Sequence, residues 1–383
     1  MVILPVHQGT PEWGSARARY YRTASRAPVM MGAGKYQSRN ELLHEIKTGV
    51  VREIDARTAE LFAAGHAAEE AARKIVEGHL KAPLLPLTCL TDDEYLLASF
   101  DGINEEMAAG WECKLWSEDL AMQVRAKQLD PHYYWQLEHQ AVVGGLAYII
   151  FTCSDGTPAR TVHMKYVPVP GRAEALLAGW RQFDSDLAEF RPVEVLPAAT
   201  AAPVMALPAL SIQVNGAITL TDNLDIFGEK LTAFIERLPA KPETDQQFVD
   251  CKSAIGTLKD AEDALNAAEA HALGQVASFD AMKRAKALWF NLSRTTRLAL
   301  EKLVAAEEQN IKIKIVTAGR TAFTEHITGL NKRLGKPYMP TIPENFAGVI
   351  KGKQKVSSLH DAVDTELARV KIEANAAADL IQI

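Results

Sequence analysis

The chain has 383 residues, of which 48% are hydrophobic and 23% are charged, and both fractions are typical of a soluble globular protein. At this length two domains are expected rather than one, and no apolar run approaches the roughly eighteen residues that a membrane span requires. The formal net charge of -6 gives no whole-protein signal for nucleic-acid binding, although a basic groove can lie on an acidic protein.

The beginning of the chain and its cysteines bear on the compartment. The first residues, MVILPVHQGTPEW, lack a basic segment followed by a long apolar core, so we expect no signal peptide. Cys89, Cys113, Cys153 and Cys251 are scattered, with no CxxC pattern and no pairing pattern. This usage indicates a reducing, cytosolic compartment.

Helix and strand signals alternate over residues 1–195, which predicts a mixed α/β domain. The segment SRNELLHEIKTG predicts a helix because Ser38 can cap it, Glu41 completes a capping box, and Gly49 follows the last turn. Further helices are expected over residues 55–80, 132–145 and 174–190, and strands over 94–101, 110–116, 147–153 and 161–169. The strand over 94–101 is expected to end in a turn at Asp101–Gly102.

An Ala- and Pro-rich stretch without charge, residues 196–210, predicts an interdomain linker, because repeated prolines interrupt helices and central strands. Residues 211–383 are then expected to form a second domain. It begins with a small β-hairpin around Asn215–Gly216 and is otherwise helical. A capped helix starts near Thr244, and a second helical run extends from about Ser278 toward Val316. A long helical hairpin follows from this, with a packing or interaction role.

The segment SFDGINEEMAAGWECKLW carries the clearest chemistry. If GWECKLW is a strand, Glu112 and Lys114 project from one face, and a hairpin through residues 103–110 brings Asp101 beside Glu112. Two neighbouring carboxylates repel each other unless a cation lies between them, and Mg²⁺ prefers oxygen ligands. A nearby lysine can orient a water or stabilise negative charge on phosphate. The alternative is an ordinary solvated hairpin, since such patterns also arise by chance.

The order of motifs resembles the PD-(D/E)xK nuclease superfamily, and within it the YqaJ-like viral recombinases and the phage lambda-type exonucleases. The family's G-x-x-x-E, Asp–Gly and E-x-K motifs, and its helix with Y-x-x-Q-x-x-H-Q, follow one another here. The matching residues are Gly65 and Glu69; Asp101 and Gly102; Glu112 and Lys114; and Tyr133, Gln136, His139 and Gln140. Near the N-terminus the W-x-x-x-R and T-A-S segments are matched by Trp13 and Arg17 and by Thr23, Ala24 and Ser25.

The resemblance covers about residues 7–155 and implies a restriction-endonuclease-like core with a mixed central sheet. It also implies roles for individual residues. Mg²⁺ or Mn²⁺ would be held by Asp101, Glu112, the Cys113 main-chain carbonyl and Glu69. Lys114 and Gln136 would complete the catalytic set, and Arg17, Ser25 and Trp13 would form a pocket for a 5′-phosphate. Arginine suits that pocket because its planar fork binds phosphate in a bidentate way.

The function implied by this resemblance is a 5′→3′ exonuclease that degrades double-stranded DNA from its ends in phage or prophage recombination. Such enzymes form trimeric rings, work with a single-strand annealing protein, and act in the cytoplasm of the bacterial host. Two residues depart from the family pattern: Phe100 replaces the proline before the first acid, and Glu138 replaces the second glutamine. The alternatives are a related endonuclease, a DNA-repair nuclease of other polarity, or a non-catalytic DNA-binding scaffold.

Overall fold

The computed structural model describes residues 1–50, 56–104, 106, 108–192, 207–210, 212–215, 219–272 and 280–382. The chain divides into two compact units. Unit 1 comprises Met1–Val193, Gly319–Val349 and Asp361–Ile383, and unit 2 comprises Glu194–Ala318 and Ile350–His360. The division predicted at residues 196–210 stays a prediction for most of that segment, because residues 193–206 lie outside the described residues.

Unit 1 contains a six-stranded sheet in the order β1-β2-β3-β4-β5-β6. The strands are β1 (Val2–Leu4), β2 (Leu85–Leu90), β3 (Leu97–Asn104), β4 (Ala109–Leu115), β5 (Tyr148–Ser154) and β6 (Thr161–Tyr166). Strands β4 and β5 are parallel, and every other neighbouring pair is antiparallel. The predicted mixed sheet is therefore confirmed, and β1 and β2 are strands that the sequence patterns did not indicate.

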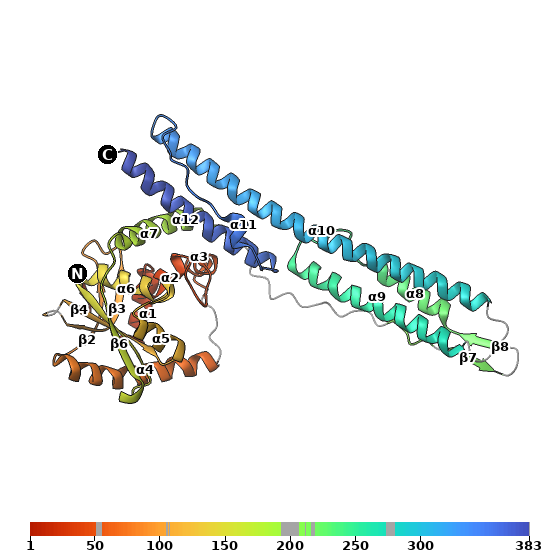
Figure 1. The fold of residues 1–383 in the computed structure, drawn as a ribbon, viewed down its shortest axis with the longest axis horizontal. Helices are drawn as coiled ribbons and strands as arrows, with labels where there is room; N and C mark the ends of the chain where they lie inside the picture. The colour runs from red at the N-terminus through yellow and green to blue at the C-terminus, as the bar shows by residue number, and fades with distance from the viewer. Residues whose placement is uncertain are drawn as a thin grey trace. The chain divides into compact units, whose positions relative to one another are not determined.

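Helices cover both faces of this sheet (Figure 1). They are α1 (Pro11–Arg19), α2 (Ala27–Met30), α3 (Arg39–Thr48), α4 (Ala56–Leu80), α5 (Glu118–Ala126), α6 (Pro131–Gly144) and α7 (Arg172–Glu189), with short 3₁₀ turns at Ala24–Arg26 and Pro158–Arg160. Helix α4 packs its Ala72 and Val76 against Trp111 of β4. On the opposite face, α6 and α7 enclose the larger core. The predicted capping box of α3 is present, with Ser38 and Glu41 bonding reciprocally and Gly49 in the left-handed region.

The strand β3 carries a β-bulge at Asp101–Gly102, where the sequence indicated a turn. Leu85 pairs with Ile103 and Leu87 pairs with Phe100, so β3 has one more residue than β2 between these pairs. The strand continues to Asn104, and the prediction that it ends at Asp101 is wrong. A bulge accommodates the extra residue within the ladder and re-aims a side chain without reversing the chain. The following hairpin to β4 is correspondingly shorter than residues 103–110.

Helix α6 is fixed to the sheet through a buried histidine. His139 is fully buried; its Nδ1 accepts a hydrogen bond from Trp180 Nε1 at 3.2 Å, and its Nε2 lies 3.1 Å from the carbonyl oxygen of Leu97. Burial lowers the pKa of His139 to about 3, against the effect of that carbonyl. The imidazole is therefore neutral and donates through Nε2, so His139 has a packing role.

The end of the chain returns to unit 1. It includes the last part of α10 (Asp280–Arg333), α11 (Phe346–Val349) and most of α12 (Val356–Gln382). Two hydrogen bonds explain why: Asn40 donates to Asp364 at 2.7 Å, and Asn375 donates to Gln182 at 3.0 Å. The structure thus differs from the predicted second domain over 211–383, because one unbroken helix, α10, contributes to both units.

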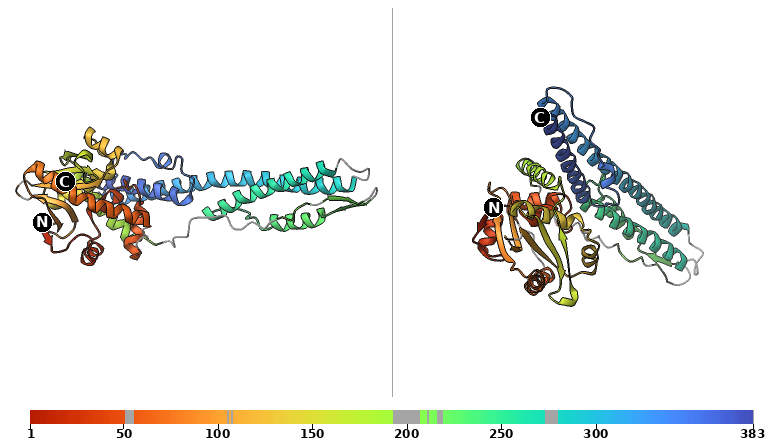
Figure 2. Two further views of the ribbon diagram at one scale, coloured as in Figure 1. Left: turned by 90° about the horizontal axis from the view of Figure 1, so that it is seen from below. Right: turned by 60° about the vertical axis from the view of Figure 1, so that its left-hand side comes forward.

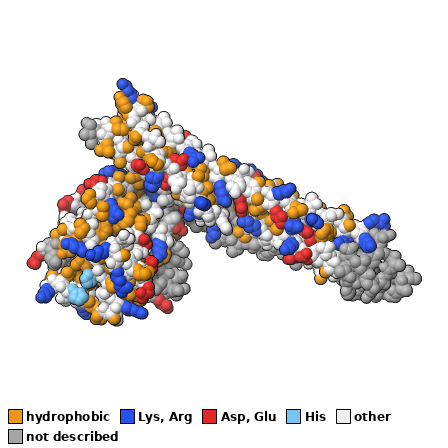
Figure 3. Space-filling view, in the orientation of Figure 1, with side chains coloured by type: hydrophobic (Ala, Val, Ile, Leu, Met, Phe, Trp, Pro, Cys, Tyr) orange, Lys and Arg blue, Asp and Glu red, His pale blue; other side chains and the backbone are white. Residues whose placement is uncertain are grey.

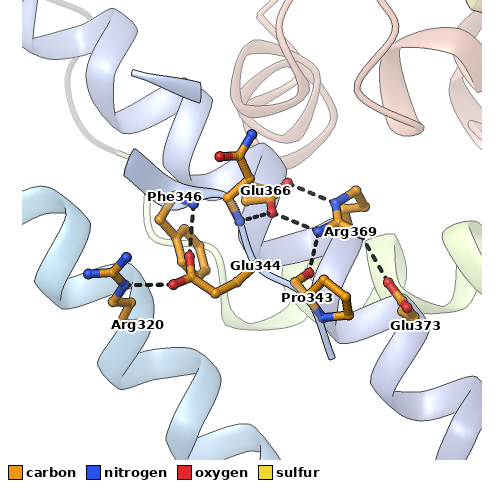
Figure 4. A network of polar contacts seen from close by, with 8 residues as sticks. Arg320, Pro343, Glu344, Phe346, Glu366, Arg369 and Glu373 are labelled. Atoms are coloured by element: carbon orange, nitrogen blue, oxygen red, sulfur yellow. Dashed lines mark hydrogen bonds and ion pairs between the residues drawn. The ribbon is translucent and has the colours of Figure 1, made fainter. Parts of the chain in front are cut away.

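A network of charged groups holds the segment before α11 to α12 (Figure 4). Arg369 Nη2 donates to the Pro343 carbonyl at 2.8 Å and its Nε donates to Glu366 at 2.8 Å. Glu366 in turn accepts from the main-chain N–H of Asn345 at 2.7 Å. Arg320 pairs with Glu344 at 2.8 Å. Because Glu366 is almost fully buried, these partners satisfy a carboxylate that would otherwise destabilise the fold.

Unit 2 is a small hairpin and a helical bundle. Its elements are β7 (Ile212–Asn215), β8 (Thr219–Asp222), α8 (Leu224–Ile235), α9 (Asp245–Ala272) and α10 up to Ala318. The strands pair as predicted, while the turn at 216–218 lies outside the described residues. The α9 stripe of Phe248, Cys251, Leu258 and Leu265 is buried.

Helices of unit 2 run side by side in both orientations of Figure 2. On the side shown in Figure 3, acidic and basic side chains are interspersed along them. None of the described helices combines the length and hydrophobicity that crossing a bilayer requires.

Candidate active site

Asp101 and Glu112 lie where β3 and β4 separate. The pairing of these strands runs from Asn104 and Ala109 to Gly102 and Trp111, so Asp101 and Glu112 occupy the next opposed positions. The carboxylate of Asp101 accepts a hydrogen bond from the main-chain N–H of Cys113 at 2.8 Å. The bulge and this bond place Asp101 beside β4, as the sequence pattern predicted, although through different backbone geometry.

Glu112 is the most constrained member of the site. Only 3% of its side chain is exposed, against 33% for that of Lys114. Its Oε1 accepts from Lys114 Nζ at 2.7 Å and from Gln136 Nε2 at 2.7 Å, and its Oε2 accepts from Gln140 Nε2 at 2.6 Å. Three donors thus hold one carboxylate in a fixed orientation. Two of them, Gln136 and Gln140, come from consecutive turns of α6.

Gln140 is a site contact that the sequence analysis did not include among its functional residues. Its spacing from Gln136, four residues on a helix, would have placed both on one face. Glu138 lies on the other side of α6, where its Oε1 accepts from Tyr166 Oη at 2.5 Å and from the N–H of Val169 at 2.9 Å. The replacement of a family glutamine by Glu138 therefore does not alter the contacts of Glu112.

Glu69 approaches the site from α4 but is engaged by its own helix. Arg73 Nη2 donates to Glu69 Oε1 at 2.6 Å, one turn away. Burial raises the pKa of Glu69, and the charge of Glu112 adds to this while Arg73 opposes it. The charged groups of the site therefore influence one another electrostatically. We call them the acidic cluster: Glu69, Asp101, Glu112 and Lys114.

The carboxylates of the acidic cluster repel one another. Burial, followed by the charges of Glu112 and Glu69, raises the pKa of Asp101 well above its usual value. Burial alone would lower the pKa of Lys114, but Glu112 and Asp101 outweigh it and raise that pKa. Lys114 is thus a firmly protonated cation among three carboxylates. Crowded carboxylates of this kind are relieved by a bound cation.

The residues fit a hard divalent cation held by two carboxylates. Within the described residues, no three Asp, Glu, His or Cys side chains converge closely enough to hold a metal ion together. Glu69 is ion-paired with Arg73, and its predicted part in binding the metal or a metal-bound water stays a prediction. Mg²⁺ is commonly bound through one or two carboxylates and retains several waters, so Asp101 and Glu112 with the Cys113 carbonyl satisfy its chemistry.

A second group of predicted residues also lies together. We call it the arginine cluster: Trp13, Arg17 and Ser25. Arg17 Nη2 donates to Ser25 Oγ at 2.9 Å, and its guanidinium carbon lies 4.5 Å from the centre of the Trp13 ring. Burial and the neighbouring Arg26 lower the pKa of Arg17 to about 10, against Glu45. Among the ion pairs of the described residues none involves Arg17, so this cation can accept an anion without breaking one.

Ser99 of β3 connects the two clusters. Its Oγ accepts from Trp13 Nε1 at 2.8 Å, and its carbonyl accepts from Gln140 Nε2 at 3.2 Å. Since Gln140 also holds Glu112, a continuous set of hydrogen bonds joins the arginine cluster to the acidic cluster. Neither Ser99 nor this connection was predicted, because no motif marks a residue that acts through its main chain.

Replacing Gln140 with leucine is expected to lower kcat on linear DNA about 10- to 100-fold, since a buried bond to a charged group contributes roughly 1.5–3 kcal/mol. Steady-state digestion with Mg²⁺ measures this. Gln128→Leu, at an exposed position, is the matched control and should leave kcat unchanged. Equal rates for Gln140→Leu and wild type would show that Gln140 does not position Glu112.

Comparisons with known proteins give a family match over part of the chain. Residues 12–147 match the model of the YqaJ-like viral recombinase domain. A comparison with curated proteins gives no match. Among solved structures, the alkaline exonuclease LHK-Exo from Laribacter hongkongensis is similar at 20% identity and a TM-score of 0.40, covering 47% of this chain and 93% of that one. LHK-Exo in complex with dAMP gives 19% identity, the same TM-score of 0.40 and the same coverage, 47% and 93%.

Proposed function

Because residues 12–147 carry a YqaJ-like viral recombinase domain, we propose that the chain is a Mg²⁺- or Mn²⁺-dependent exonuclease that degrades double-stranded DNA from 5′ ends. The observation that supports this most is the convergence of Asp101, Glu112 and Lys114 at the separation of β3 and β4, with Lys114 Nζ 2.7 Å from Glu112 Oε1. Two oxygen ligands and a protonated lysine are what phosphodiester hydrolysis assisted by a metal requires.

Each residue of the site has a role in this reaction. Asp101, Glu112 and the Cys113 carbonyl would hold the cation, which when bound would neutralise charge on the scissile phosphate and activate a water. Lys114 keeps its proton on Nζ, orients the attacking water and stabilises the negative charge that develops on phosphate. Gln136 and Gln140 hold the Glu112 carboxylate in place. The product is a nucleotide with a 5′-phosphate.

The arginine cluster supplies polarity in this proposal. Arg17 and the Ser25 hydroxyl bind the terminal 5′-phosphate, and Trp13 supports the guanidinium by stacking. Through Ser99 and Gln140 this cluster lies two hydrogen-bonded residues from Glu112. A bound terminal phosphate is thereby set at a fixed distance from the acidic cluster, which favours release of residues from the 5′ end.

The expected result is faster digestion of linear duplex DNA with 5′-phosphate ends than with 5′-hydroxyl ends. Loss of a charge-assisted contact of about 1.5–3 kcal/mol corresponds to roughly a 10- to 100-fold difference in kcat/KM. Arg17→Met should abolish the preference. Arg19→Met, at an exposed position two residues further along α1, should keep it. Products from differently end-labelled strands report polarity.

Other outcomes separate the alternatives. Release of label first from the 3′ end, or equal rates on both kinds of end, would contradict the 5′→3′ proposal. Cleavage of closed circular DNA would indicate an endonuclease, and binding without metal-dependent digestion would indicate a scaffold. The ring-shaped trimer, the annealing partner, and a phage or prophage origin in a bacterial cytoplasm rest on the family resemblance. They stay predictions, and a measurement of the molecular mass in solution tests the trimer.

A further inference from the structure

A tyrosine stands exposed at the edge of the candidate active site. Tyr36, in the loop between α2 and α3, has 76% of its surface exposed. The ring of His132, at the start of α6, meets it edge-on at 6.0 Å and 85°. His132 in turn lies 5.0 Å from the ring of Tyr133. An aromatic row thus runs from solvent to α6, and its outermost ring is largely exposed.

The loop that presents Tyr36 is held in one conformation. Gln37 Nε2 donates to Glu45 at 2.7 Å. At Gly34 an added Cβ would lie 2.3 Å from the Gln37 carbonyl oxygen, so the turn is too tight for a side chain. The loop therefore presents a large aromatic ring to solvent beside the first turn of α6.

Positive charge lies beside this ring. Lys35 Nζ is 5.7 Å from the centre of the Tyr36 ring. Lys114 of the acidic cluster is close enough to depress the pKa of His132, after the effect of burial. Burial raises the pKa of Tyr133; Tyr36 adds to this and Lys114 opposes it. Tyr133, at the inner end of the row, packs against Phe151 of β5 with ring centres 5.7 Å apart. Phe151 is the partner of Glu112 in the pairing of β4 and β5, so the aromatic row borders the acidic cluster.

We propose that Tyr36 stacks on a nucleobase of the DNA strand that enters the acidic cluster. This inference rests on the proposed nuclease function and adds a positioning contact to it. Aromatic side chains beside basic groups are how proteins hold single-stranded nucleic acid without regard to sequence, because every base offers a π-face. The Tyr36 hydroxyl is not needed for such a contact, and the ring alone supplies it.

Tyr36→Ala is expected to raise KM for 5′-phosphorylated duplex DNA roughly 5- to 150-fold, the range that stacking on one base gives, with a smaller change in kcat. Tyr36→Phe should behave as wild type. Tyr338→Ala removes another exposed tyrosine, 55% accessible in the loop after α10, and should have no effect. A second readout is the fluorescence of 2-aminopurine placed near the 5′ end of the DNA, measured with Ca²⁺ in place of Mg²⁺. Binding should quench this fluorescence for wild type and Tyr36→Phe but not for Tyr36→Ala.

The outcomes separate this inference from the function on which it rests. If the wild type binds and digests DNA and Tyr36→Ala has the same KM and the same quenching, the stacking role alone is overturned. Wild type that quenches on binding but never cleaves would sink the nuclease proposal and leave the stacking contact in place. A change in molecular mass for Tyr36→Ala, with DNA affinity intact, would assign Tyr36 to an interface between copies of the chain and contradict the proposal.

Discussion

Lys114→Met is expected to lower kcat/KM for linear duplex DNA by about 10²- to 10³-fold or more, the usual cost of removing one preorganised group that stabilises transition-state charge. Methionine keeps most of the side-chain volume and removes the ammonium that lies 2.7 Å from Glu112. DNA affinity should change little, because a single positive charge contributes a modest share of binding to a polyanion. Initial rates with saturating Mg²⁺ and a gel-shift titration in Ca²⁺ measure the two quantities.

Lys74→Met is the matched control for this experiment. Lys74 lies on α4 with 74% of its side chain exposed and pairs only with Glu70 one turn away, so the same loss of charge should leave the rate within about twofold, as expected of a surface pair. Lys114→Arg separates charge from position: it restores the charge but not the compact ammonium, and should recover only part of the rate. A fully active Lys114→Met would remove the lysine from the mechanism.

Trp180→Ala is expected to lower the free energy of unfolding by about 3–5 kcal/mol, the range for removing a large buried aromatic side chain. Trp180 is 0% exposed, its ring packs against Phe183 at 5.6 Å, and its Nε1 is the donor to His139. The substitution leaves a cavity and a buried nitrogen acceptor without a partner. Urea unfolding followed by circular dichroism measures the loss.

Trp180→Phe separates the two contributions, since it retains most of the ring packing and removes the hydrogen bond. A smaller loss, about 1–3 kcal/mol, is expected for it. Because His139 sits between Gln136 and Gln140 on α6, Trp180→Ala should also reduce nuclease activity below the unfolding transition. A loss under about 1 kcal/mol for Trp180→Ala would show that α7 does not hold α6 in place.

The features that the sequence predicted well are those set by neighbouring residues. The capping box at the start of α3 depends on Ser38 and Glu41 alone and its C-cap on Gly49, and all three residues act as expected. The shared face of Glu112 and Lys114 follows from strand alternation and needs no knowledge of the rest of the fold. The long helices of unit 2 follow from apolar periodicity in the same way.

The features that were missed depend on distant partners. Asp101–Gly102 carries a turn signal, but pairing with β2 holds it in the ladder and converts the turn into a bulge. Which α6 glutamine reaches Glu112 depends on the rotation of the helix, which the buried His139 and Trp180 fix from another part of the chain. The way α10 belongs to both units is likewise a tertiary outcome.

The central claim is that Asp101 and Glu112 bind a divalent metal ion, and one crystallographic measurement tests it directly. Crystals soaked in Mn²⁺, with data collected at the manganese absorption edge, should show an anomalous peak between the two carboxylates and beside the Cys113 carbonyl. Crystals of the Asp101→Asn, Glu112→Gln double variant should lack it. Absence of the peak in a wild-type crystal that remains active on DNA with Mn²⁺, or a peak elsewhere, would contradict the account.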